Sequence, residues 1–283
     1  MARHLLTGAS GFIGQHLAKM LTELGHQVIA LPRELLLDPP SLQAFLAERK
    51  PDYVFHLAAY GNKYDQQDER QIVEVNIIGT FNLLESSQHL PLKAFINVGS
   101  SSEYGTKSKP MVETDSLDTN TFYGASKASS ALLCRAFATK YNRPVVTARP
   151  FSIYGEGDDP KHFIPTAIKA FKEGEELKLA KGVHDWTHVE DLAEGLLIVA
   201  KNAEELKGMA VNIGTGLQTT NYEVVSLLRQ TSGLPGNVKH VDLLRSYDNT
   251  TAWVADNSLI KSLGWVPQHK LETDLERMYW SWR

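Results

Sequence analysis

The sequence contains a single cysteine, Cys134, among its 283 residues, so the chain cannot form an internal disulfide bond. The cysteine content therefore does not call for an oxidising compartment. The sequence also lacks any apolar run close to the roughly 20 residues that a membrane-spanning helix needs. The N-terminal Met-Ala-Arg-His leads directly into a predicted strand, which leaves no room for a signal peptide. We expect a cytoplasmic protein with no membrane partner.

Excess charge of either sign is also lacking. The formal net charge is −4 at pH 7, which argues against a general role in binding nucleic acid or anionic membranes. It still permits a local basic site for a phosphorylated ligand. With 42% apolar and 22% charged residues, the composition is that of a globular protein large enough to bury a core.

The first half of the chain alternates short apolar runs with amphipathic stretches, a pattern typical of a parallel sheet covered by helices. The sequence therefore predicts an α/β fold with a doubly wound parallel sheet. We expect strands at residues 4–7, 27–31, 35–37, 53–57, 94–98 and 145–149, and helices at about 12–24, 41–49, 72–89 and 121–141.

After Pro150 the predicted elements become shorter and less regular, and glycines and prolines interrupt the chain. We therefore expect a first part at residues 1–150 and a smaller, irregular α/β part at residues 151–283, with some chain crossing between them. Helical patterns in the second part lie near residues 164–172, 189–201, 222–231 and 271–282.

A glycine-rich turn, Thr-Gly-Ala-Ser-Gly-Phe-Ile-Gly at residues 7–14, follows the first predicted strand. Glycines let the backbone approach a pyrophosphate, whose charge then lies at the N-terminus of the next helix. The spacing of Gly8, Gly11 and Gly14 is one residue wider in its first gap than the commonest dinucleotide motif. Its position between a strand and a helix indicates a dinucleotide-binding site.

The end of the second predicted strand usually distinguishes NAD from NADP, because an acidic residue there bonds the ribose 2′-hydroxyl of NAD. This chain has Leu31-Pro32-Arg33 at that place. No carboxylate would repel a 2′-phosphate, and Arg33 could pair with one, although it would also suit a solvated turn. We therefore expect NADP rather than NAD.

Tyr123 and Lys127 open a predicted helix at i and i+4, which places them on one face. A phenol with its ordinary pKa of about 10 is a poor base at neutral pH. A nearby ammonium lowers that pKa and makes the tyrosine usable in proton transfer. Lys127 can also bond the cofactor ribose. Such pairs occur by chance on surface helices, so this one needs support from other segments.

That support comes from the fifth predicted strand, which runs into Ser-Ser-Ser-Glu-Tyr-Gly at residues 100–105. The carboxyl end of a parallel strand is where ligands bind in this architecture. We expect Ser100 to donate to the substrate oxygen whose proton Tyr123 transfers, rather than to lie in an ordinary polar loop.

These segments together resemble the extended short-chain dehydrogenase/reductases, the nucleotide-sugar epimerase/dehydratase family. The resemblance covers nearly the whole chain. Besides the segments at residues 7–14, 100–105 and 123–127, it rests on His-Leu-Ala-Ala (56–59), Asn76 with Gly-Thr (79–80) and Asn-Leu-Leu-Glu (82–85), Arg-Pro-Phe-Ser-Ile-Tyr-Gly (149–155), His-Asp-Trp-Thr-His-Val-Glu-Asp (184–191), Asn-Ile-Gly (212–214) and Leu-Gly-Trp-Val-Pro (263–267).

The resemblance implies a Rossmann-type domain at residues 1–150 that binds NAD(P), and a second part that binds a nucleoside-diphosphate sugar. Ser100, Tyr123 and Lys127 fall on the family's catalytic positions. The resemblance also implies a homodimer formed through the two long helices, although burial of an apolar face would explain those helices equally well. We expect no metal site. Besides the three glycines, Arg33, Tyr123 and Lys127, the implied cofactor contacts are Phe12, Ile13, Leu57, Ala58, Ala59, Asn76 and Pro150.

Departures from the family pattern bear on the reaction. Family members that dehydrate the sugar at C4–C6 carry an Asp or Ser and then a Glu just after the catalytic hydroxyl, whereas this chain has Ser101 and Ser102. Glu103 comes one residue later, so strand alternation should point it elsewhere. We therefore do not expect a 4,6-dehydratase.

The residues expected to contact the substrate also depart from the family pattern. His184 stands where the family has an arginine that meets the pyrophosphate, and a neutral histidine is a weaker phosphate partner. Ser152 replaces the family's usual asparagine, and Arg245 resembles a later arginine that could compensate. We expect substrate contacts from Ser101, Ser102, Ser152, His184 and Arg245.

Two enzymatic hypotheses use the same Ser100, Tyr123 and Lys127. A reductase would transfer hydride from NADPH to C4 of a 4-keto-6-deoxy sugar, whereas a 4-epimerase would oxidise C4 and reduce it on the other face with retained NAD. The missing acid at the second strand favours the reductase. A non-catalytic dinucleotide-sensing regulator is the hypothesis of another class, and it predicts loss of residues that are all present.

Overall fold

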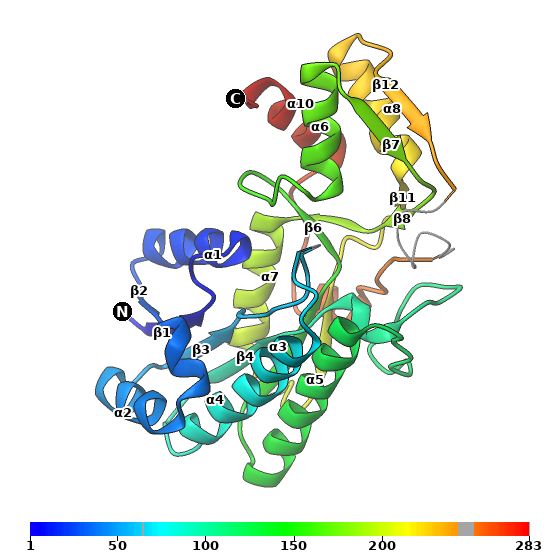
Figure 1. The fold of residues 1–283 in the computed structure, drawn as a ribbon. Helices are drawn as coiled ribbons and strands as arrows, with labels where there is room; N and C mark the ends of the chain where they lie inside the picture. The colour runs from blue at the N-terminus through cyan, green and yellow to red at the C-terminus, as the bar shows by residue number, and fades with distance from the viewer. Residues whose placement is uncertain (64, 243–251, 283) are drawn as a thin grey trace.

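A six-stranded parallel sheet forms the centre of the molecule, in the order β10-β5-β4-β3-β1-β2 (Figure 1). The structure is a computed structural model and describes residues 1–63, 65–242 and 252–282. The expected α/β fold with a parallel sheet is confirmed. The strands are β1 (Arg3–Thr7), β2 (Gln27–Ala30), β3 (Tyr53–His56), β4 (Ala94–Val98), β5 (Val145–Pro150) and β10 (Ala210–Ile213).

Helices cover both faces of this sheet because successive strand residues point to opposite sides. Leu6 of β1 and Ile96 of β4 pack with α1 and α7, whereas Leu5 and Phe95 pack with α2, α4 and α5. Figure 1 shows the two helix layers on either side of the sheet. The helices are α1 (Phe12–Glu23), α2 (Pro39–Arg49), α4 (Gly79–Ser87), α5 (Phe122–Tyr141) and α7 (Val189–Lys201).

The strand order has a switch point at β1, because β2 lies on one side of it and β3 on the other. The connections that leave β1 and β3 therefore diverge. A crevice forms at such a point, at the carboxyl ends of the strands, and ligands bind there in open α/β sheets. The glycine turn at residues 8–14 lies at this point.

One predicted element of the first part is wrong, and another is helical as expected but irregular. Residues 35–37 form no strand and belong to the 3₁₀ helix η1 (Arg33–Leu37), because Leu36 is buried and its carbonyl accepts a hydrogen bond from Asn82 of α4 (3.1 Å). The helix expected at residues 72–89 is divided into α3 (Glu69–Val73), a π-helical turn η2 (Glu74–Ile78) and α4. The π-helical turn contains the buried Asn76.

The chain after residue 150 contributes to both parts. The elements α7, β10 and α9 (Ser258–Ser262) pack against the central sheet, while α6 (Phe163–Glu173), α8 (Asn221–Ser232) and α10 (Leu271–Ser281) share a second core. Short strands pair as β6 (Ser152–Tyr154) with β9 (Trp186–His188), β7 (Glu176–Leu179) with β12 (Asn237–His240), and β8 (Val183–His184) with β11 (Thr219–Thr220). Every described helix is too short or too polar to cross a lipid bilayer.

Candidate active site

A cavity of about 990 Å³ lies at the carboxyl ends of β1, β3, β4 and β5. Segments from the second part, at residues 157–166 and 177–186, complete its wall. It brings together most of the residues that the sequence predicted for cofactor, catalysis and substrate. Those that line it are Gly8, Gly11, Phe12, Ile13, Gly14, Leu57, Ala59, Ser100, Ser101, Ser102, Tyr123, Lys127, Pro150, Ser152 and His184.

The glycine turn forms the floor of one end of the cavity. Gly8 has a φ of +66°, and its carbonyl accepts a hydrogen bond from the Gly11 N–H (3.0 Å). A Cβ added at Gly14 would lie 2.2 Å from the Gly8 carbonyl oxygen, so α1 could not approach the turn with any other residue there. The N-terminus of α1 therefore faces the cavity beside bare backbone, a cradle that fits the pyrophosphate of a dinucleotide.

His56 supports this turn through Thr7, a role that was not predicted from the sequence. The Thr7 hydroxyl donates a hydrogen bond to His56 Nδ1 (2.8 Å), and His56 Nε2 donates one to the Thr80 hydroxyl (2.9 Å). The Thr80 hydroxyl in turn donates to the Asn76 carbonyl (2.7 Å). Burial, reinforced by the Lys127 charge, lowers the pKa of His56 to about 3. The neutral imidazole thus joins β1, β3 and α4. Its position in a buried strand directly before Leu57 was the available signal.

Three predicted cofactor residues are absent from the described cavity wall. The amide of Asn76 is buried, where it bonds both backbone groups of Tyr60 and the Ser126 hydroxyl at 2.8 Å each. Ala58 faces the turn, with its N–H donating to Thr7 (2.9 Å), and Arg33 is exposed at the start of η1. Asn76 fixes the loop after β3 against α5, and its contact with the cofactor stays a prediction. Arg33 stays a prediction.

Ser100, Tyr123 and Lys127 all line the cavity. Ser100 follows β4, while Tyr123 and Lys127 lie one turn apart at the start of α5, whose first turn is capped by Thr121 (3.0 Å to the Gly124 N–H). The Ser100 side chain opposes the rise in the pKa of Tyr123, and both side chains line the cavity. Lys127 is buried and donates to the Val98 carbonyl (2.6 Å), at the end of β4. The arrangement can hold and protonate one substrate oxygen.

The proton affinity of Tyr123 differs from the sequence-based expectation. Burial raises the pKa of Tyr123 to about 12, Glu103 adds to the rise, and the hydrogen bond from Ser100 opposes it. Burial also lowers the pKa of Lys127, whose ammonium is directed at the Val98 carbonyl. The expectation that Lys127 lowers the pKa of Tyr123 is wrong for the chain by itself, because desolvation is the larger effect.

The substrate end of the cavity brings the chain's departures from the family pattern together. The Ser152 hydroxyl lies 2.9 Å from His184 Nδ1, and the His184 ring packs on Trp186 with 4.6 Å between centroids. Trp253, which the sequence analysis missed, donates from its indole N–H to Ser101 (3.1 Å) and lines the cavity. The predicted Arg245 lies outside the described residues.

Two ion pairs connect loops on opposite sides of the cavity mouth. Lys63 Nζ lies 2.8 Å from Asp159 Oδ2, and Lys161 Nζ lies 3.0 Å from Asp65 Oδ2. Lys63 and Asp65 follow β3, whereas Asp159 and Lys161 follow β6. The ammonium of Lys63 lowers the pKa of Asp159, and that carboxylate raises the pKa of Lys63. Since Lys63, Asp159 and Lys161 line the cavity, the contacts join its two walls.

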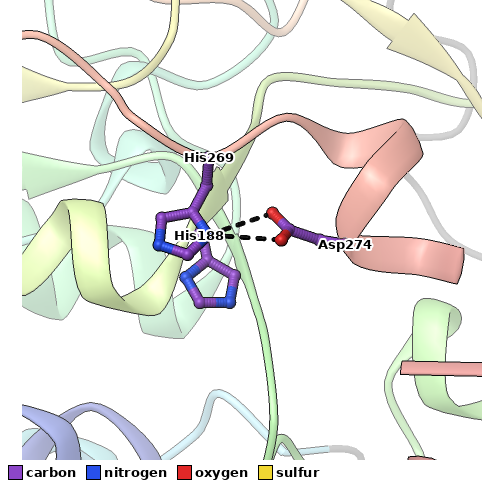
Figure 2. A group of neighbouring side chains, drawn as sticks. All are labelled: His188, His269 and Asp274. Atoms are coloured by element: carbon purple, nitrogen blue, oxygen red, sulfur yellow. Dashed lines mark hydrogen bonds and ion pairs between the residues drawn. The ribbon is translucent and has the colours of Figure 1, made fainter. Parts of the chain in front are cut away.

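A second cluster of titratable side chains lies near α10, outside the residues that line the cavity. Figure 2 shows His188 and His269 stacked, with 3.7 Å between ring centroids, and Asp274 directed at His269. Their ligand atoms lie within 4.8 Å of one another. His188 Nδ1 accepts the Glu190 N–H (3.3 Å), which leaves the proton on Nε2, and Arg277 Nη2 lies 3.0 Å from Asp274. This arrangement is better suited to an ionic network that holds α10 in place than to a metal-binding site.

Comparison with known proteins identifies relatives over the full fold. Residues 4–214 match the model of the "NAD dependent epimerase/dehydratase family". A probable UDP-glucuronate 4-epimerase of Rhizobium meliloti is 28% identical over 69% of this chain and 67% of its own. The structure of UDP-glucuronic acid 4-epimerase from Bacillus cereus, with UDP-glucuronic acid and NAD, superposes with a TM-score of 0.88, 26% identity and 98% of each chain covered. UDP-glucose 4-epimerase from Thermotoga maritima, with UDP-glucose, gives a TM-score of 0.89 and 26% identity over 98% of this chain and 97% of that one.

Proposed function

This chain belongs to the NAD dependent epimerase/dehydratase family, and from this premise we propose that it is a 4-epimerase of a nucleoside-diphosphate sugar. The observation that carries the proposal is the similarity, over 98% of both chains, to a 4-epimerase with NAD. The sequence favoured a 4-keto-sugar reductase, on the missing acid at the second strand. We now prefer the epimerase to the reductase, because the absence of a carboxylate at the end of the second strand is compatible with binding of either NAD or NADP.

The chemistry proposed for the site is proton transfer at the C4 oxygen of the sugar. In its phenolate form, Tyr123 takes the hydroxyl proton as the C4–H bond breaks, and it returns the proton when C4 is reduced on its other face. Ser100 donates a hydrogen bond to the same oxygen, and Lys127 holds the cofactor end of the site. The dinucleotide, when bound, supplies the hydride acceptor and donor. Because oxidation and reduction alternate, the net reaction consumes no reductant.

The dinucleotide proposed is NAD, bound by the first part of the chain with its pyrophosphate at Gly8, Gly11 and Gly14. An epimerase must keep its dinucleotide between the two half-reactions, and the Bacillus cereus structure holds NAD. Arg33, the residue that favoured NADP, is exposed at the start of η1. The domain assignment proposed is 1–150 for the dinucleotide and 151–283 for the nucleotide sugar, with α7, β10 and α9 crossing to the sheet.

A 4,6-dehydratase is a less suitable proposal. Ser101 and Ser102 carry no acid, and the nearest carboxylate, Glu103, is fully buried and paired with Arg149 (2.7 Å). Glu103 is not among the described residues that line the cavity. The site thus offers no carboxylate at the position where the family's dehydratases carry theirs.

A homodimer is proposed on the helices α3–α4 and α5, which lie side by side (Figure 1). Val73, Ile78, Phe81 and Leu132 are exposed apolar side chains on these helices. A second copy would cover such side chains, which otherwise face water.

The test is to release and identify any dinucleotide from the purified protein, and then to incubate the protein with UDP-glucuronic acid and UDP-glucose separately. The proposal expects retained NAD and a product epimeric at C4, resolved by chromatography. Tyr123→Phe is the matched control and should lose turnover while keeping the dinucleotide. An empty site that oxidises NADPH only with a 4-keto sugar would support the reductase. Dinucleotide binding without turnover of any nucleotide sugar would support the regulator.

A further inference from the structure

Glu103 is a buried carboxylate directly behind Ser100. Its side chain has no exposed surface, and its two oxygens have separate partners. Oε1 accepts the backbone N–H of Ser100 (2.9 Å), and Oε2 pairs with Arg149 Nε of β5 (2.7 Å). A Cβ added at Gly99 would lie 2.2 Å from Oε1. The end of β4 is thus shaped around this carboxylate.

The contact with the backbone of Ser100 also sets the direction of its hydroxyl. Ser100 Oγ accepts the N–H of Ser102 (3.1 Å) while Glu103 accepts the N–H of Ser100, so the two side chains cap the 3₁₀ helix η3 (Ser101–Tyr104) reciprocally. Because a lone pair of the Ser100 oxygen is used by this cap, its proton is free to be donated. The donor then faces Tyr123 and the cavity.

The charge of Glu103 acts on the same group of residues. It raises the pKa of Tyr123 and opposes the fall that burial causes in the pKa of Lys127. Arg149 limits this influence, since it pairs with Glu103 and also donates to the Tyr104 hydroxyl (2.9 Å). Tyr104 in turn donates to Asn212 of β10 (2.7 Å). The carboxylate is therefore held in place from the sheet.

We propose that Glu103, with Arg149 as its counter-charge, is a positioning residue that aims the Ser100 hydroxyl and sets the electrostatic environment in which Tyr123 and Lys127 handle the proton. The inference rests on the proposed function, because it assigns Glu103 to the same proton transfer. Glu103 does not line the cavity and acts only through its neighbours. A purely structural ion pair would leave the pH dependence of the reaction unchanged.

The test uses full-length protein loaded with NAD. Glu103→Gln keeps an oxygen for the Ser100 N–H and removes the charge. Because that variant leaves Arg149 buried without a counter-charge, the double variant Glu103→Gln with Arg149→Met keeps the pair neutral and guards against misfolding. Tyr104→Phe is the matched control, since it removes one of the other hydrogen bonds of Arg149 without changing Ser100 or the net charge.

The expected result for the double variant is a fall in kcat of about 10- to 100-fold with KM within about twofold, because a neutral amide oxygen holds the Ser100 N–H more weakly than a carboxylate does, while the substrate contacts are kept. Loss of the negative charge favours the Tyr123 phenolate, the form that takes the proton, so the acidic limb of the kcat profile should move by about half a pH unit towards lower pH. Tyr104→Phe should keep the wild-type profile.

A wild-type kcat and pH profile in the folded double variant would overturn the inference, as would an equal loss in Tyr104→Phe. Ser100→Ala and Tyr123→Phe, measured in parallel, separate this failure from that of the proposed function. If those two variants retain turnover, the proton-transfer site itself is wrongly assigned. If they lose turnover while the double variant does not, only the role of Glu103 is wrong.

Discussion

The hydroxyl of Ser152 lies 2.9 Å from Nδ1 of His184, so two residues that depart from the family pattern 32 positions apart form one contact at the substrate end of the cavity. His184 ends β8, two residues before Trp186, and Trp186 pairs with Ser152 in the parallel β6–β9 ladder, so the backbone keeps the two side chains close together. The two departures therefore act as a unit. Ser152 fixes the orientation of the His184 imidazole, which lines the cavity.

This contact predicts non-additive effects on substrate binding. His184→Ala and Ser152→Ala should each raise KM for the nucleotide sugar by about three- to tenfold, with kcat nearly unchanged, because the hydrogen bond serves binding rather than the reacting atoms. The double variant should be little worse than His184→Ala alone. Steady-state kinetics on the four proteins tests this, and strictly multiplicative effects would contradict the coupling.

The pKa of about 12 for Tyr123 predicts that its phenol stays protonated at neutral pH in protein stripped of dinucleotide. NAD brings a positive charge into the same cavity and should shift the ultraviolet phenolate signal to lower pH. The reduced dinucleotide, whose ring is neutral, should shift it less. The signal is the difference between wild type and Tyr123→Phe titrated in parallel. Equal shifts with both redox forms would argue against charge as the cause.

His4 predicts a loss of stability in mild acid. Burial lowers its pKa from 6.5 to about 4, and neither ring nitrogen has a hydrogen-bond partner among the described residues. The unfolded chain then binds more protons than the folded one between these pH values, so the free energy of unfolding should fall by up to about 3 kcal/mol as pH drops from 6.5 to 4. Urea unfolding should show this fall reduced in His4→Phe and kept in the exposed control His89→Gln.

The ion pairs across the cavity mouth predict a salt-sensitive KM. Screening of Lys63–Asp159 and Asp65–Lys161 should loosen the contact between the two walls, so KM should rise a few-fold between about 0.05 and 0.5 M salt. Lys63→Asp should raise KM at low salt, and adding Asp159→Lys should restore it. A charge-swapped double variant no better than Lys63→Asp would show that the pairs do not join the walls.

The exposed apolar side chains of α4 and α5 predict a dimer that charge can disrupt. Phe81→Glu combined with Leu132→Glu should convert the protein to a monomer in sedimentation experiments, since a dimer would have to bury both charges. Leu234→Glu, at a comparably exposed leucine after α8, is the control and should leave the mass unchanged. A wild-type protein that sediments as a monomer would contradict the proposal directly.

Much of the fold was predictable because the strands of the central sheet follow a simple pattern in the sequence. Strands β1, β3 and β4 are short apolar runs between amphipathic helices, and β4 was predicted at its observed bounds. The error at residues 35–37 has a physical cause. Leu35, Leu36 and Leu37 suit a strand locally, but Leu36 packs against α4, beside Gly79, instead of extending the sheet.

The candidate site was predictable where chemistry constrains residue type and spacing together. A backbone cradle needs Gly8 and Gly14, and one helical turn brings Tyr123 and Lys127 to the same face. The roles of Asn76 and Arg33 were harder to predict from the sequence, since an amide or a guanidinium group can make many kinds of contact. Only the contacts in the folded protein show that the side-chain amide of Asn76 is hydrogen-bonded to Tyr60 and Ser126.

The parallel α/β fold, the glycine cradle and the set of Ser100, Tyr123 and Lys127 could be predicted from the order of residues, because they depend on local backbone freedom and short spacings. The contacts between residues far apart in the chain became visible only in the folded protein. Folding brought Ser152 to His184, Trp253 to Ser101 and Glu103 to Arg149. Burial in the folded protein also raises the pKa of Tyr123 instead of lowering it. Burial depends on all the surrounding elements, so a short sequence motif cannot predict it.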